Sequence, residues 1–521
     1  MASPNHRKSN AAPSATQKPA VVHGHKRPAG RKHKLGFGHW MRRVLSVHTT
    51  AAHKLDADTV HDLRVALRRC RSMADGLREV DSDPAWGAMK KAGRKLFRHL
   101  GDLRDTQVMM EWVEKLEPPG DTAARTVLAS LRDREFNLKQ QTAESLARFD
   151  RVQWKSWAKY LAERAERVPV DGPVYRHIAL ERWQEAYDLH RTALRNRSAR
   201  SWHRLRIGIK RFRYTVENFL PSALAEWGAD LKHLQDLLGE VHDLDMLWIS
   251  LTKSGKAFNT SERARWRAII GKERQLRLDE YRKKMTGPGS LWHVWRCGLP
   301  QGVALESSGL QKLSTWAALM DKEFVHAEHV AKLALDLYTG LAAARLPGPY
   351  RETRNRLLLR AAALLHNVGH AAGRKGHHKE SYRLIRKITP PIGWSKEDVE
   401  IIALVARYHR GAWPRAQHPG YAALPPVRRE IVLHLGGILR LAAAFDHAHT
   451  RAVKRLYVQN HPEALLIWAQ GYRQYAENAR ILAAERHLLE RALRKPVIIR
   501  PRPTSPKKAQ IAEDEAAALV A

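Results

Sequence analysis

Cysteines, acidic residues and long apolar runs are scarce in this chain of 521 residues. The two cysteines, Cys70 and Cys297, are too few for a disulfide framework, so we expect a reducing compartment. No run of about 18 apolar residues occurs, which argues against a membrane-spanning helix. The N-terminal stretch contains no apolar segment of the signal-peptide kind. Together these absences predict a cytoplasmic protein.

Negative charge is the most pronounced shortage. The chain has 53 Asp and Glu against 91 Lys and Arg, which gives a net charge of +38 with histidine neutral. Such an excess destabilises the compact state unless a polyanion neutralises it. Nucleic acid, an anionic membrane surface and an inorganic polyanion are all open as partners. The sequence has neither zinc-finger spacing nor an RNA-recognition motif, so we expect nucleic acid to bind only nonspecifically.

Composition and periodicity divide the chain into five segments. Residues 1–34 are rich in Lys, Arg, His, Ala and Pro and predict a disordered basic tail. Residues 35–286 carry long stretches of period 3.6 and predict a helical domain. Gly and Pro interrupt the helical period in 287–304, which predicts a linker. Residues 305–500 predict a second, mostly helical domain that ends in a hairpin, a helix and a strand, and 501–521 predict a disordered tail.

A basic motif occurs twice in the first helical region. The sequence VHDLRVALRRCR at 60–71 returns as WHRLRIGIKRFR at 202–213, 142 positions later. On a helix, the basic residues of each copy fall within an arc of about 80° that borders the apolar face. A stripe in that position favours a role in lining a groove. The two stripes consist of His61, Arg64, Arg68 and Arg71, and of His203, Arg206, Lys210 and Arg213.

The segment after each basic motif is repeated as well. LGDLRDTQ at 100–107 corresponds to LGEVHDLD at 238–245, and Arg94 then corresponds to Lys232. The repeat is therefore a unit of several helices. Two such units predict a mainly α fold made of two helical-bundle repeats with approximate two-fold symmetry.

These motifs resemble those of a CHAD domain, the conserved histidine α-helical domain. The match rests on HDLRVALRRCR with GDLRD, and on HRLRIGIKRFRY with LQDLLGEVHDLD. The resemblance implies two pseudo-symmetric four-helix units around a basic cavity, and inorganic polyphosphate as the partner. It implies polyphosphate contacts at the eight stripe residues, with Arg94 and Lys232 as further contacts. The alternative is a structural network in which the arginines pair with acidic residues. Those residues are Asp102, Asp105, Asp243 and Asp245.

Five histidine-bearing segments follow one another in the second helical domain. They are FVHAEHVAKLAL, ALLHNVGH, GHHKESYRLI, ALVARYHRG and RLAAAFDHAH. Their order resembles the HD superfamily, and more closely the C-terminal domain of the exopolyphosphatase and guanosine pentaphosphate phosphohydrolase family. This resemblance implies a divalent-metal site at His326, His366 and Asp446, with His377 or His409 as a further ligand. The alternative is that these histidines are packed in the core or face phosphate.

Two departures from that family argue against catalysis. The usual His-Asp pair is His366-Asn367 here, and a neutral Asn brings no charge to offset that of a divalent ion. The two actin-like catalytic domains of the phosphatases also have no counterpart, because no Gly-rich phosphate loop occurs. We therefore expect a non-catalytic polyphosphate-binding protein, located in the cytoplasm at polyphosphate granules. The alternative is a metal-dependent phosphohydrolase of the HD type, acting on polyphosphate or a phosphorylated nucleotide.

Overall fold

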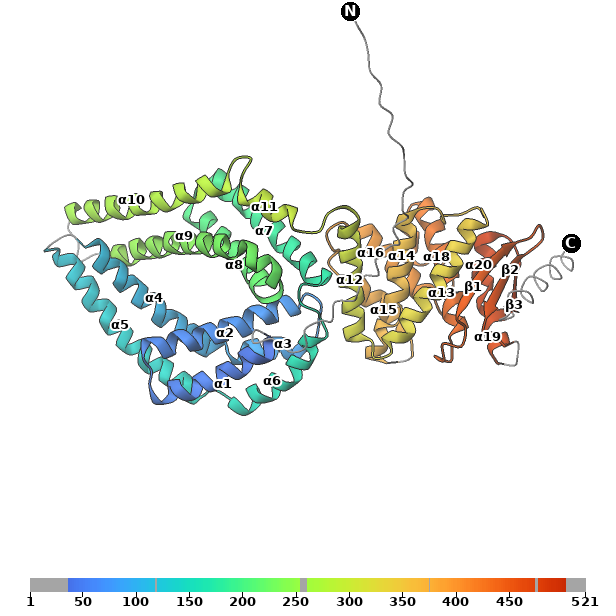
Figure 1. Cartoon of the computed structure of the whole chain (residues 1–521), viewed down its shortest axis with the longest axis horizontal. Helices are drawn as coiled ribbons and strands as arrows, with labels where there is room; N and C mark the ends of the chain where they lie inside the picture. The colour runs from blue at the N-terminus through green and yellow to red at the C-terminus, as the bar shows by residue number, and fades with distance from the viewer. Residues whose placement is uncertain (1–35, 118–119, 254–259, 374, 474–476, 503–521) are drawn as a thin grey trace, which may run out of the picture.

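The computed structural model describes residues 36–117, 120–253, 260–373, 375–473 and 477–502. Within them the chain is mainly helical, with one small sheet near the end, which confirms the predicted fold class (Figure 1). The predicted tail 1–34, and all but the first two residues of the predicted tail 501–521, lie outside the described residues. None of the described helices has both the length and the apolar character that a membrane crossing requires.

Two sets of helices form the N-terminal half, one for each sequence repeat. The first set is α1 (Phe37–His53), α2 (Ala57–Leu77), α3 (Pro84–Ala92), α4 (Arg94–Leu116), α5 (Thr122–Ala147) and α6 (Arg151–Glu166). The second set is α7 (Pro173–Asn196), α8 (Ala199–Phe219), α9 (Pro221–Lys253), α10 (Thr260–Met285) and α11 (Leu291–Cys297). The two basic motifs occupy α2 and α8, as predicted.

Both basic helices begin at a polar capping residue. The Asp56 side chain accepts a hydrogen bond from the backbone N–H of Thr59 at the start of α2, and the Ser198 hydroxyl accepts one from Ser201 at the start of α8. A capping oxygen pairs one of the backbone donors that a helix leaves unsatisfied at its first turn. The caps therefore set where each basic stripe starts along its helix.

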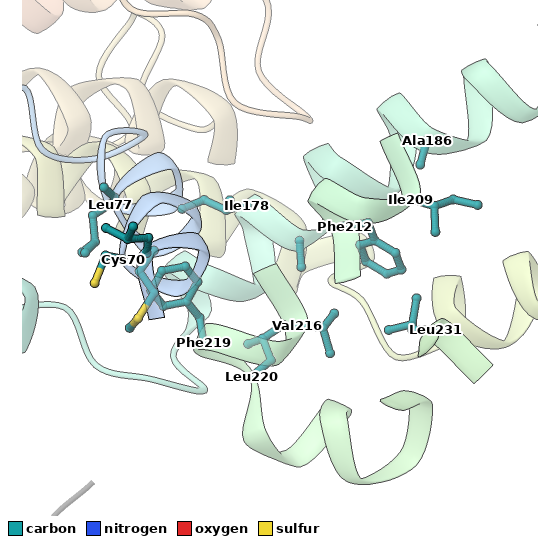
Figure 2. Packing of buried hydrophobic residues seen from close by; sticks show 14 of the residues in the cluster. Cys70, Leu77, Ile178, Ala186, Ile209, Phe212, Val216, Phe219, Leu220 and Leu231 are labelled. Carbon is teal, nitrogen blue, oxygen red and sulfur yellow. The ribbon is translucent and has the colours of Figure 1, made fainter. Parts of the chain in front are cut away.

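The two repeats meet through α2 against α8, and through α4 against α9 (Figure 1). Figure 2 shows the apolar contact: Cys70 and Leu77 of α2 lie near Phe219 at the end of α8. A Cβ atom on Gly76 would lie 2.4 Å from the Phe219 ring, so only glycine allows this approach. The Phe219 ring also stacks on Tyr175 with 4.1 Å between ring centroids. This packing holds the two basic helices together.

A separate apolar cluster joins the far ends of the two repeats. It contains Trp112 of α4, Leu244 and Leu247 of α9, and Trp266 of α10. Asp121 accepts a hydrogen bond of 3.1 Å from the Trp266 indole, which satisfies that buried donor. The repeats are thus connected at two places, and the helices between those places face each other.

The segment 287–304, which the sequence predicts as a linker, is packed against the first domain. It contains α11, whose Trp292 and Trp295 are fully buried in the N-terminal core. Burial of two indoles removes a large apolar area from water. This stabilises the packed conformation by more than the surrounding Gly and Pro residues disfavour it. The next helix, α12 (Gly302–Met320), packs on α7, where the His177 imidazole lies 2.9 Å from the Ser308 hydroxyl.

The C-terminal half is a helical domain with a three-stranded sheet. Its helices after α12 are α13 (Phe324–Ala343), α14 (Thr353–Leu365), η1 (Val368–Ala372), α15 (His377–Ile385), α16 (Lys396–Tyr408), α17 (Pro419–Ala422), α18 (Pro426–Phe445), α19 (Glu477–Glu485) and α20 (His487–Leu493). Strands β1 (Arg455–Asn460) and β2 (Leu465–Gln470) form the predicted antiparallel hairpin. Strand β3 (Val497–Arg502) pairs with β2 in parallel.

Candidate functional site

Four cationic side chains converge where α2 packs against α8. We call Arg64 and Arg68 of α2, together with Arg206 and Lys210 of α8, the basic cluster. The Tyr214 ring lies between the two helices, with the Arg68 guanidinium carbon 5.4 Å and the Lys210 ammonium nitrogen 5.8 Å from its centroid. The positive charges of the other three members all act on Lys210. The structure thus brings both halves of the repeat into one site.

The basic cluster has few partners of opposite charge. The nearest carboxylate to Arg64 is that of Asp105, at 4.0 Å, and Arg68, Arg206 and Lys210 form no ion pair with any residue that the structure describes. The Nε atoms of Arg64 and Arg68 are buried without a hydrogen-bond partner among those residues. A buried charge without partners destabilises the folded state. An anion that accepts these hydrogen bonds would relieve that cost.

Burial shifts the protonation of the groups around the cluster. It lowers the pKa of Lys210 to about 8, and the neighbouring Arg206 adds to this effect. It raises the pKa of Asp243 to about 6, although the positive charge of Arg206 opposes the rise. Burial also lowers the pKa of His242 to about 4. Near neutral pH the basic cluster is therefore close to fully charged, while the His242 imidazole is neutral.

Two of the predicted contacts are occupied within the protein. Arg71 donates a hydrogen bond of 2.6 Å to the backbone oxygen of Lys90, and its guanidinium lies 5.0 Å from the centre of the Phe97 ring. Arg213 lies 3.9 Å from a carboxylate oxygen of Glu217. Arg71 thus contacts α3 and α4, whereas Arg213 pairs within α8. Both arginines therefore already have partners within the protein.

The remaining predicted contacts lie at the edge of the site or away from it. The side chains of His61, Arg94 and Lys232 are solvent-exposed. The Nδ1 atom of His203 lies 3.2 Å from Nδ1 of His242 on α9, and burial lowers the pKa of His203. His203 therefore acts as a neutral hydrogen-bonding group at the border of the cluster.

The four acidic residues of the repeated motif do not form a network of ion pairs with the stripe arginines. They are Asp102, Asp105, Asp243 and Asp245. Of the four carboxylates, only that of Asp105 comes within 4.0 Å of a stripe residue, and Asp245 instead pairs with Arg274 at 2.8 Å. Sequence reasoning missed Tyr214, although the motif ends on it, four residues after Lys210. That spacing places Tyr214 one helical turn from Lys210.

The C-terminal domain contains a second site, which we call the histidine pocket. It is a cavity of about 480 Å³. It is lined mainly by imidazole and guanidinium groups of α13 to α19. Its polar lining consists of His326, His366, Asn367, His370, His377, His409, Arg410, Arg440, His447, His449, Arg480 and Glu485. The structure therefore brings the histidines of all five sequence segments together.

Hydrogen bonds already pair the predicted metal ligands with protein atoms. The Nδ1 atom of His326 lies 2.8 Å from one oxygen of Asp446, and the other oxygen accepts a 2.6 Å hydrogen bond from the backbone N–H of Arg451. These hydrogen bonds lower the pKa of Asp446 against the effect of burial. Both oxygens of this carboxylate are thus engaged.

Two further histidines of the pocket, His366 and His409, are buried and hydrogen-bonded. The Nδ1 atoms of His366 and His409 each lie 2.6 Å from a backbone carbonyl oxygen, so Nδ1 carries the proton in both rings. Burial lowers the pKa of His366 to about 3, and it holds the pKa of His409 well below its usual range. The His409 Nε2 atom lies 3.2 Å from Nε2 of His377, so it accepts a hydrogen bond from that ring.

This arrangement does not fit the divalent metal that the resemblance to the HD superfamily implies. In the described ranges, no three His, Cys, Asp or Glu side chains are grouped so that they could hold a metal ion. Asn367 also supplies an uncharged amide where the HD family has a carboxylate. A metal ion could reach Nε2 of His326, because the hydrogen bond to Asp446 uses only Nδ1 of that ring, but it would have to break the His377–His409 pair to reach the Nε2 lone pair of His409.

Two family comparisons agree with this architecture. Residues 41–252 match the CHAD domain, so the N-terminal half of the chain is a protein domain of that class. Residues 313–486 match the third domain of the Ppx/GppA phosphatases, and the chain is therefore a CHAD domain followed by a Ppx/GppA-type domain. Together the two domains indicate a function related to polyphosphate.

Among solved structures, the chain is similar to the CHAD domain from the plant Ricinus communis. It is 21% identical, with a TM-score of 0.36, and the alignment covers 50% of this chain and 88% of that one. No curated protein matches the chain.

Proposed function

We propose that this protein binds inorganic polyphosphate through the basic cluster. The observation that carries the proposal is the meeting of four almost unpaired cations from two helices. Polyphosphate has about one negative charge per phosphorus, and arginine binds phosphate oxygens through two parallel hydrogen bonds. Each charge-assisted contact contributes about 1.5–3 kcal/mol before the cost of ordering the chain. No covalent step is needed, and recruitment to polyphosphate granules follows from binding.

The geometry of Tyr214 favours polyphosphate over single-stranded nucleic acid. Proteins that bind single strands without sequence preference stack bases on exposed aromatic rings. Here Arg68 and Lys210 lie over the Tyr214 ring, and this side chain is only partly exposed. The cluster offers charge to phosphate groups but no free ring face to a base.

The test is polyphosphate affinity measured over a salt series, with single-stranded DNA as competitor. We expect binding to persist at physiological salt and to fall with a log–log slope of roughly −0.7 per neutralised phosphate. DNA should displace polyphosphate only at a large excess. Equal competition by DNA would mean that the measurement reports bulk charge, and the proposal would fail.

The affinity should also depend on pH in two steps. Raising the pH through about 8 removes the proton of Lys210, and raising it through about 6 ionises Asp243, so each step makes the cluster less positive. We therefore expect polyphosphate to bind more tightly at about pH 5 than at about pH 9. An Asp243→Asn variant should lose the lower step and keep the upper one. Unchanged profiles in this variant would contradict the assignment of Asp243.

A further inference from the structure

Asn367 is the feature of the histidine pocket that the family comparison does not explain. Asn367 is 3% exposed, and it lines the cavity. A primary amide carries two N–H donors and one acceptor oxygen, which a group bound in the cavity can use. Relative to aspartate, asparagine removes a negative charge and adds an N–H donor.

The charged side chains of the pocket are mostly positive. Arg440 is buried and pairs with Glu485, the only carboxylate side chain among the described residues that line the cavity. The two other arginines, Arg410 and Arg480, are exposed and form no ion pair with a described residue. Their guanidinium groups give the cavity a net positive charge, which opposes a cation and favours an anion.

The hydrogen-bond pairs inside the pocket also favour an anion over a cation. A cation would compete for the Asp446 oxygens, which accept hydrogen bonds from His326 and Arg451, and for Nε2 of His409, which accepts one from His377. An anion needs donors, and the Asn367 amide and the two exposed guanidinium groups can supply them. An anion can therefore bind without breaking either pair.

We propose that the histidine pocket binds a phosphate group, held by Arg410, Arg480 and the amide of Asn367. The group would be either free orthophosphate or the terminal unit of a polyphosphate chain, which present the same oxygens. A cavity of about 480 Å³ accommodates either one together with water. The pocket and the basic cluster lie in different domains, so each can bind an anion without the other.

The experiment is calorimetric titration of the full-length protein with orthophosphate and with tripolyphosphate. The basic cluster is first removed by changing Arg64, Arg68, Arg206 and Lys210 to alanine. The result then does not depend on whether that cluster binds polyphosphate. Pocket variants Asn367→Asp and R410A/R480A are compared with R351A/R356A, which removes two exposed arginines elsewhere in this domain. Circular dichroism confirms folding, and elemental analysis measures the metal content of the purified protein.

We expect orthophosphate to bind the cluster-free protein and its R351A/R356A form equally. Asn367→Asp should weaken binding about tenfold or more, because the new carboxylate repels phosphate. R410A/R480A should have an effect of the same size, because it removes two charged hydrogen-bond donors. Much tighter binding of tripolyphosphate would identify the chain end as ligand, and equal binding would identify free phosphate. The proposal is overturned if R410A/R480A binds like the control, or if the purified protein holds a stoichiometric metal ion.

Discussion

Changing Arg64, Arg68, Arg206 and Lys210 together to alanine should weaken polyphosphate binding at least 100-fold. Four charge-assisted contacts of about 1.5–3 kcal/mol each would exceed this loss if they added fully. About 2.7 kcal/mol, less than half of that sum, already corresponds to a factor of 100. The slope of log affinity against log salt should fall by about 3, because four contacts contribute roughly 0.7 each. Affinity measured at several salt concentrations gives both values.

The matched control changes Lys155, Lys159, Arg263 and Arg267 to alanine. These residues are exposed on α6 and α10, and their removal lowers the net charge by the same amount. We expect this control to bind within a few-fold of wild type. Thermal unfolding should show that the cluster variant is as stable as wild type or more so, because it removes charges that lack partners. Equal losses in both variants would show that bulk charge drives binding.

The largest effect on stability is expected for Asp81→Ala. Asp81 is 3% exposed, and its carboxylate accepts two 2.7 Å hydrogen bonds from Arg164 and one of 2.8 Å from the Trp86 indole. Removing it leaves a largely buried guanidinium whose remaining carboxylate partner is Asp83, at the longer distance of 3.6 Å. Loss of one partner of such a pair costs about 3–5 kcal/mol. Denaturant unfolding, followed by fluorescence, should show the transition of the N-terminal domain at a lower midpoint.

Asp75→Ala is the control for that loss. Asp75 also pairs with a basic residue, Lys90, but its side chain is 54% exposed. Solvent screens such a pair, so its removal should cost less than about 1 kcal/mol. If both variants unfold at the same denaturant concentration, burial of the Asp81–Arg164 pair is not the source of its stability.

Periodicity was sufficient to predict the secondary structure around both sites. The apolar positions of 60–71 and 202–213 recur at helical spacing, and the structure has helices there. The alternating residues at 455–470 likewise predicted the hairpin of β1 and β2. Such patterns act within a few residues of each other, so they can be read without knowledge of the tertiary fold. The packed tryptophans of 287–304 could not be predicted in this way, because their burial depends on α7 and α8.

The sequence by itself determined that two basic stripes exist and on which helices they lie. Only the tertiary structure decided that Arg64, Arg68, Arg206 and Lys210 meet, while Arg71 and Arg213 are held by other partners. The same division holds for the histidines, whose segments could be found along the chain but whose hydrogen-bond pairs could not. The reason is physical: a stripe follows from the helical repeat, whereas the crossing of α2 and α8 follows from the packing of distant side chains such as Phe219 against Gly76.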